Sequence, residues 1–118
     1  MGEVKGLGTD IVEVERVRRA IERQGQRFLD RVFTEAEVAY CRQSRHPWPH
    51  FAVRFAAKEA VLKVFGTGWG QGLGFRDIEV LRDADGRPSI RLHGAAADLA
   101  RSRGFDDLIV SLSHTRQL

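Results

Sequence analysis

The chain has 118 residues, of which 42% are hydrophobic and 30% are charged, and its formal net charge is +3. This balance predicts a globular protein with one core, a single domain over residues 1–118, and it excludes a disordered chain. The longest apolar run is far below the roughly 20 residues that a membrane-spanning helix needs, and the mild positive charge favours anions without identifying one.

The N-terminus and the cysteine content indicate the compartment. The first ten residues, MGEVKGLGTD, carry acidic and polar side chains where a signal peptide needs an apolar stretch. Cys41 is the only cysteine, which excludes an internal disulfide and fits a reducing cytosol. We therefore expect a cytoplasmic protein that has no membrane partner.

The first third of the chain is predicted to form a strand and two helices. Val4–Ile11 fits a short strand whose glycines allow another backbone to approach closely. Glu13–Gln24 has helical apolar spacing, and Gly25 ends that helix. A second helix begins at Thr34, because TEAE has the spacing of a capping box.

The middle of the chain continues with a long helix and a hairpin. The prolines of HPWPH end the second helix before the long helix of Phe51–Gly66 begins. Asp77–Arg82 and Ser89–Leu92 fit two strands joined by DADGR, whose Asp-Gly pair is typical of a hairpin turn.

The C-terminal part is predicted to form a helix and a buried strand. AAADLARSR fits a helix that Gly104 stops, and Leu108–Leu112 fits a strand that ends at Ser113 and His114. Helices packed with a small antiparallel sheet indicate an α+β fold.

The long helix carries charges within an apolar sequence. At about 100° per residue, Phe51, Phe55, Leu62 and Phe65 share a core-facing stripe. Ala52, Ala56, Glu59 and Lys63 share the neighbouring stripe. The simplest interpretation is an ordinary ion pair between Glu59 and Lys63, which contributes roughly 0.2–0.5 kcal/mol. The alternative is that the charges point into a site, since charged residues are rarely buried without a partner.

Three further segments bear on that choice. GTGWGQGLG, residues 66–74, is compatible with phosphate binding but is equally compatible with a flexible connection, and it lacks the Walker pattern. Asp10 fits a helix cap or, together with Glu59, a magnesium site of hard oxygen ligands. SHT, residues 113–115, places a histidine at a strand end, where a structural role is the commoner one.

The first helix has arginines opposite its predicted core face. Arg16, Arg19 and Arg23 project from that side, and Arg27 follows just beyond. Such spacing is usual for a solvated helix face. It also suits docking of an acidic protein helix or of nucleic acid, because the planar guanidinium matches carboxylates and phosphates.

Three segments, GLGTDIVEVERV, FAVRFAAKEAVLKVFGTG and IVSLSHT, resemble the holo-[acyl-carrier-protein] synthase family, the small phosphopantetheinyl transferases of bacterial fatty-acid synthesis. The resemblance covers residues 6–115, and RFAAKEA followed by lysine and FGTG is its most specific part. It implies transfer of 4′-phosphopantetheine from coenzyme A to a serine of apo-acyl carrier protein, with release of adenosine 3′,5′-bisphosphate. It also implies the single-unit homotrimeric form of the 4′-phosphopantetheinyl transferase fold, with sites at the subunit interfaces.

The resemblance also implies a role for individual residues. Asp10 and Glu59 match the Mg²⁺ ligands, and Glu59, or a water it orients, is the candidate base. Lys63 matches the lysine at the pyrophosphate, so Glu59 and Lys63 are the implied catalytic pair. The implied coenzyme A site comprises Arg54, Lys58, Lys63, Gly66, Thr67, Gly68 and His114. The arginines implied to bind the acidic carrier protein are Arg16, Arg23 and Arg27.

The sequence departs from the family at its end. Family members continue past SHT with a further alternating strand, whereas this chain stops at Leu118. The expectation is that the sequence is shortened there or that one sheet edge is incomplete, which would weaken the trimer and the placement of His114.

Three other classes remain as alternatives. A nucleic-acid-binding module would use the arginines but lacks interleaved aromatics and a known motif, so we expect no nucleic-acid partner. A non-catalytic nucleotide-binding protein would keep coenzyme A binding and need no carrier protein. The broad-substrate transferases of peptide and polyketide synthesis resemble this family but are about twice as long.

Overall fold

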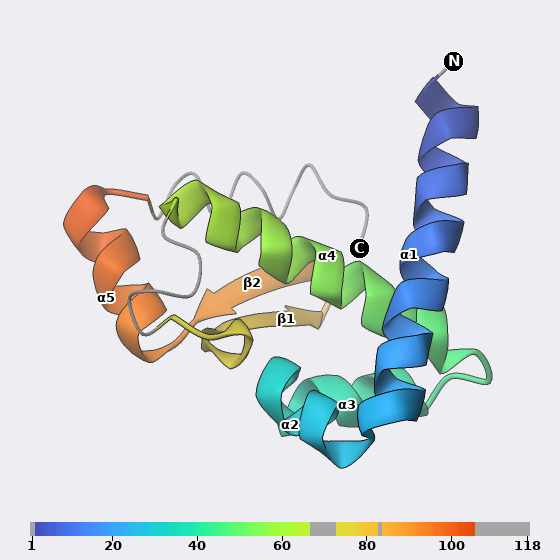
Figure 1. Ribbon diagram of the computed structural model, residues 1–118. Helices are drawn as coiled ribbons and strands as arrows, with labels where there is room; N and C mark the ends of the chain where they lie inside the picture. The colour runs from blue at the N-terminus through green and yellow to red at the C-terminus, as the bar shows by residue number, and fades with distance from the viewer. Residues whose placement is uncertain (1, 67–72, 83, 106–118) are drawn as a thin grey trace.

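The computed structural model describes residues 2–66, 73–82 and 84–105, with side-chain positions from residue 11 onward in these ranges. Figure 1 shows helix α4 lying across a β-hairpin, with α1 crossing the first half of α4 and extending its N-terminal end away from the rest. The elements, in chain order, are α1 (Gly2–Gln24), α2 (Gln26–Val32), α3 (Glu35–Arg42), α4 (Pro47–Phe65), the 3₁₀ turn η2 (Phe75–Asp77), β1 (Ile78–Arg82), β2 (Pro88–Leu92) and α5 (Gly94–Arg103).

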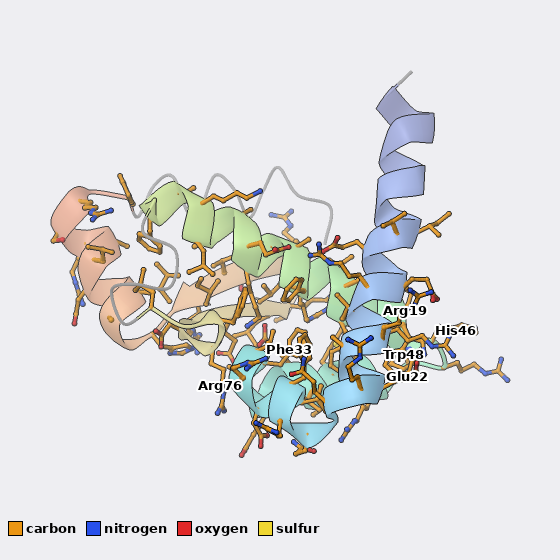
Figure 2. All side chains as sticks on the ribbon, viewed as in Figure 1. Arg19, Glu22, Phe33, His46, Trp48 and Arg76 are labelled. Atoms are coloured by element: carbon orange, nitrogen blue, oxygen red, sulfur yellow. The ribbon has the colours of Figure 1, made fainter. Side chains whose placement is uncertain are left out.

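The core lies around α4, which packs against α1, α3 and β1. Phe51, Leu62 and Phe65 of the predicted stripe are buried, and Phe55 is partly buried against them. Phe33 follows α2 and is 1% exposed; its ring centroid lies 5.0 Å from that of Phe51. Figure 2 shows Phe33 in the interior between α4 and the α2–α3 layer. This contact between two large aromatic rings helps to hold α4 against α2 and α3.

The helix ends follow the sequence signals. Thr34 caps α3, where its hydroxyl accepts from the Glu37 backbone N–H and the Glu37 carboxylate accepts from the Thr34 N–H. Gly66 and Gly104 end α4 and α5 with φ angles of 70° and 68°, a left-handed backbone that glycine adopts without a Cβ penalty. The predicted capping box and the predicted glycine stop at Gly104 are confirmed.

The hairpin is antiparallel, with Ile78 opposite Leu92 and Arg82 opposite Pro88. Gly86 in its turn has a φ of 80°, which accounts for the glycine in DADGR. This two-stranded sheet, packed against helices, confirms the predicted α+β class for the part of the chain that the structure describes.

The predicted strand over Val4–Ile11 is wrong, because these residues form the first turns of α1. Among the described residues β1 and β2 pair only with each other, so a strand at residues 4–11 would leave its backbone groups unpaired. A helix satisfies them locally. Asp10 therefore lies within a helix and not at a strand end.

Two further helical segments differ from the prediction. The seven residues of α2 were not predicted as a helix, and α4 begins at Pro47 instead of Phe51. Proline is tolerated in the first helical turn, where its missing N–H has no intrahelical acceptor. None of the described helices is long and apolar enough to cross a membrane. The predicted strand over Leu108–Leu112 lies outside the described residues.

Candidate functional site

Two carboxylates and an arginine meet where α1 crosses α4. Arg16 Nη2 lies 2.9 Å from Glu13 Oε1 on α1 and 3.7 Å from Glu59 Oε1 on α4. The side chains of Glu13 and Glu59 are 22% and 37% exposed, whereas that of Arg16 is 60% exposed. The guanidinium therefore covers the two acids from the solvent side.

Burial raises the pKa of Glu59, and the neighbouring charge of Glu13 raises it further. The charges of Arg16 and Lys63 act in the opposite direction but do not cancel these effects. A carboxylate in this position is a stronger base than an exposed one. A cation bound beside it would stabilise its ionised form. Carboxylate oxygens are the donors that Mg²⁺ prefers, with water and phosphate completing its shell, so the chemistry of Glu13 and Glu59 fits this ion. Within the described ranges no cluster of three such ligands forms.

Lys63 stands one turn beyond Glu59 and is exposed in the last turn of α4. Its ammonium is free to approach an anion beside Glu59. Gly66 follows directly, and its N–H donates to the carbonyls of Leu62 and Lys63. That N–H ends the helix and does not point to a ligand.

Lys58 is directed to the opposite side of the helix and is fully buried. Its Nζ donates to Glu37 Oε1 at 2.7 Å, to the Phe75 carbonyl at 3.0 Å and to the Ile78 carbonyl. Burial lowers the pKa of this lysine, and the charge of Glu37 opposes the change. Lys58 thus ties α4 to α3, η2 and β1.

Arg54 is 3% exposed and lies on the same side as Lys58. Its guanidinium stacks on the Tyr40 ring at 4.4 Å and donates to the His50 carbonyl at 3.2 Å. Among the residues that the structure describes, its buried Nε has no hydrogen-bond partner. The charges of Arg54 and Arg82 add to the effect of burial, which lowers the pKa of His50. This corner of α3 and α4 is positive and suits an anion.

A groove of about 560 Å³ runs along α1. Its described lining consists of Ile11, Val12, Glu15, Arg16, Arg19, Ala20, Arg23 and Gln24. Ile11 and Val12 are 59% and 65% exposed, which is unusual for large apolar side chains. Figure 2 shows Arg19 on the side of α1 that faces away from the hairpin. An apolar floor with an arginine rim is typical of a docking surface for an acidic partner.

The structure brings together some of the predicted site residues. Arg16 and Glu59 are in contact, and Lys63 acts on Glu59 through its charge. Arg54 and Lys58 lie on another side of α4, and Arg27 is exposed on α2. The positions of Thr67, Gly68, His114 and the Asp10 side chain lie outside the described residues.

Sequence reasoning missed two residues at this site and its support. Glu13 was assigned only as the first residue of a predicted helix, yet it shares Arg16 with Glu59. The i,i+3 spacing of Glu13 and Arg16 was the available signal. Glu37 was recognised as a helix cap, but nothing local indicated that the same carboxylate holds Lys58 from 21 residues away.

The family model and the individual relatives indicate the same protein family. The model of the 4′-phosphopantetheinyl transferase superfamily matches residues 6–113. The chain is 49% identical to the holo-[acyl-carrier-protein] synthase of Ruminiclostridium cellulolyticum over 93% of this chain and 83% of that protein. It is 41% identical to the synthase of Solibacter usitatus, over 98% of this chain and 92% of that one.

Solved structures agree with these sequence matches. The crystal structure of holo-[acyl-carrier-protein] synthase from Neisseria meningitidis superposes with a TM-score of 0.68 at 34% identity, covering 77% of this chain and 73% of that one. The acyl carrier protein synthase of Plasmodium yoelii, solved with ADP bound, has a TM-score of 0.60 at 32% identity and covers 77% and 70%. The chain belongs to the 4′-phosphopantetheinyl transferase superfamily, in which its relatives are holo-[acyl-carrier-protein] synthases.

Proposed function

We propose that this protein transfers 4′-phosphopantetheine from coenzyme A to a serine of apo-acyl carrier protein, releasing adenosine 3′,5′-bisphosphate. The observation that carries the proposal is similarity to holo-[acyl-carrier-protein] synthases over nearly the whole chain. The contact of Glu59 with Arg16 supports it, because it places an acid–base group beside the groove where a protein partner would dock. The protein is then an enzyme of fatty-acid and lipid biosynthesis.

Coenzyme A is proposed to bind along α4 and the segment after it. The relative solved with ADP supports binding of coenzyme A as such, since coenzyme A contains an adenosine diphosphate unit. The proposed contacts are Arg54, Lys58, Lys63, Gly66, Thr67, Gly68 and His114. Arg54 has the clearest support, because its buried Nε has no acceptor within the described ranges. Lys58 already has three acceptors, so any effect it has on coenzyme A would be exerted through its charge.

The reaction is proposed to depend on Mg²⁺ held by Asp10 and Glu59. When bound, this ion supplies polarisation of the pyrophosphate and acidifies a bound water or hydroxyl. Glu59, or a water that it orients, accepts the proton of the attacking serine, a task to which its raised pKa is suited. Lys63 neutralises the charge that grows on the leaving bisphosphate.

The acyl carrier protein is proposed to dock on the arginines of the first two helices, Arg16, Arg23 and Arg27. Two of these residues line the α1 groove next to exposed Ile11 and Val12. An acidic amphipathic helix would satisfy both the apolar floor and the positive rim. Its seryl hydroxyl would then approach Glu59 from the side that Arg16 covers.

The assembly and location are proposed from the family alone. We infer one domain over residues 1–118, a cytoplasmic homotrimer, and no nucleic-acid or membrane partner. Sedimentation equilibrium would test the trimer, because a mass of one subunit at micromolar concentration would contradict it.

The mass of apo-acyl carrier protein after incubation with the protein, coenzyme A and Mg²⁺ tests the function. We expect a gain of about 340 Da, the mass of the carried phosphopantetheine group, that is lost with EDTA and in Glu59→Gln. Glu22→Gln is the matched control, because Glu22 is exposed on α1 and pairs only with Arg18 among the described contacts. No gain with folded wild-type protein would refute the transferase. Retained binding of coenzyme A would then indicate the non-catalytic alternative.

A further inference from the structure

Arg16 takes part both in the contact with Glu13 and Glu59 and in the lining of the α1 groove. Its guanidinium contacts the carboxylates of Glu13 and Glu59, and the same side chain lines the α1 groove. Arg19 and Arg23 line the groove as well, but neither has a described contact with Glu59. Of these three arginines, Arg16 is therefore the one that links the groove to the partly exposed acids Glu13 and Glu59.

We propose that Arg16 is a latch on the Glu13–Glu59 pair, which is closed in the free protein and opened by the acidic carrier. This inference rests on the proposed function. In the closed state, the guanidinium donates to Glu13 Oε1 and lies 3.7 Å from Glu59 Oε1, where its charge opposes a divalent cation. In the open state, carboxylates of the docked partner draw Arg16 outward, and Glu59 becomes available to the cation.

The guanidinium of Arg16 and a divalent cation repel each other at Glu59, so the presence of one disfavours the other. Glu13 Oε1 and Glu59 Oε1 lie 2.9 Å and 3.7 Å from the same nitrogen of Arg16, so its positive charge stabilises both carboxylates. Arg16 on α1 and Lys63 on α4 are the cations whose charges act on Glu59. A divalent ion at Glu59 would meet the repulsion of a guanidinium that lies 3.7 Å from the same carboxylate. Withdrawal of Arg16 removes that repulsion.

The ion pairs that Arg16 makes with Glu13 and Glu59 are weak enough for a docked partner to break. Arg16 is more exposed than either acid, and ion pairs at such positions contribute little to stability. A partner that offers several carboxylates along the groove would therefore compete effectively. Linkage requires the coupling to be reciprocal, so that carrier binding tightens cation binding by the same factor as the cation tightens carrier binding.

Titration of Mn²⁺ followed by its paramagnetic resonance signal, without carrier or coenzyme A, tests the closed state. Arg16→Gln is expected to bind Mn²⁺ about fivefold more tightly than wild type, the factor that corresponds to an exposed ion pair. Arg16→Lys retains the charge and is expected to behave as wild type. Arg19→Gln, with the same loss of charge on the same helix, is expected to leave the affinity unchanged, because Arg19 pairs with Glu15.

A second titration tests the opening. Apo-carrier whose acceptor serine is replaced by alanine is added to saturation, and it is expected to tighten Mn²⁺ binding by wild type but not by Arg16→Gln. Equal Mn²⁺ affinities of wild type and Arg16→Gln, or no binding by any variant, would overturn the latch. These failures differ from failure of the proposed function, which is a wild-type protein that leaves the mass of apo-carrier unchanged.

Discussion

Lys58 Nζ lies 2.7 Å from Glu37 Oε1, and neither side chain is exposed to solvent. Glu37 also accepts from the backbone N–H groups of Thr34 and Val80. One buried carboxylate thus joins the start of α3, the middle of α4 and Val80 of strand β1. The residue that follows Lys58 is Glu59, so this ion pair fixes the position of α4 from which the candidate base projects toward α1.

Substitution of Lys58 by Met should destabilise the protein by roughly 3–5 kcal/mol, because it leaves the Glu37 carboxylate buried without its counter-charge. Urea unfolding at pH 7 would measure the change. The double variant Lys58→Met with Glu37→Gln should be more stable than the single variant, since glutamine still accepts from Val80 without carrying charge. A single-variant cost below about 1 kcal/mol would contradict the assigned role.

The lowered pKa of Glu79 makes part of the free energy of unfolding sensitive to acid. Burial raises its pKa, but hydrogen bonds from Thr34 and His93 outweigh burial, and the net pKa lies below the ordinary value of 4.5. A carboxyl with a depressed folded-state pKa stabilises the fold above its unfolded pKa and loses this contribution as the pH falls through the folded-state pKa.

In Glu79→Gln the loss of stability between about pH 5 and pH 3 should therefore be smaller than in wild type. Urea unfolding across this range measures it. Asp98→Asn serves as the control, because Asp98 is 79% exposed and pairs with an exposed arginine. Identical acid profiles of wild type and Glu79→Gln would contradict the prediction.

Local signals predicted most of the described elements. Thr34, Gly86 and Gly104 each stand where a cap or turn needs that residue type, and each has the expected geometry. Such signals succeed because the required hydrogen bond or φ angle depends on a few neighbouring residues.

Features that depend on distant partners were beyond the sequence. The glycine-rich start of the chain favoured a strand, but a strand needs a neighbour, and the described sheet provides none. The apolar pattern of Phe51–Gly66 indicated that its charged residues need partners or a ligand. It did not show toward which element each side chain points. Lys58 turned inward to Glu37, whereas Glu59 turned outward to Arg16, because α3 and α1 supply the opposite charges.

Lys63→Gln should lower kcat for phosphopantetheine transfer by about a hundredfold, the usual effect of removing one group that stabilises developing negative charge. The side chain is exposed, so the melting temperature should stay within error of wild type. Lys63→Arg should recover part of the rate, since it restores the charge with a different shape. Stopped assays of carrier mass under saturating coenzyme A would give kcat, and an unchanged value in Lys63→Gln would exclude this lysine from the reaction.

Arg54→Lys should weaken binding of coenzyme A while leaving the chemical step intact. The guanidinium stacks on Tyr40, and in the described part of the chain its buried Nε has no acceptor, so it can offer a donor that lysine does not have. We expect KM for coenzyme A to rise about tenfold, as for loss of one charge-assisted hydrogen bond, with kcat changed little. Arg101→Lys, an exposed replacement on α5, should alter neither constant. If Arg54→Lys lowered kcat and left KM unchanged in a folded protein, Arg54 would act on the reacting groups and not on substrate binding, because binding that is equal in the ground and transition states changes KM alone.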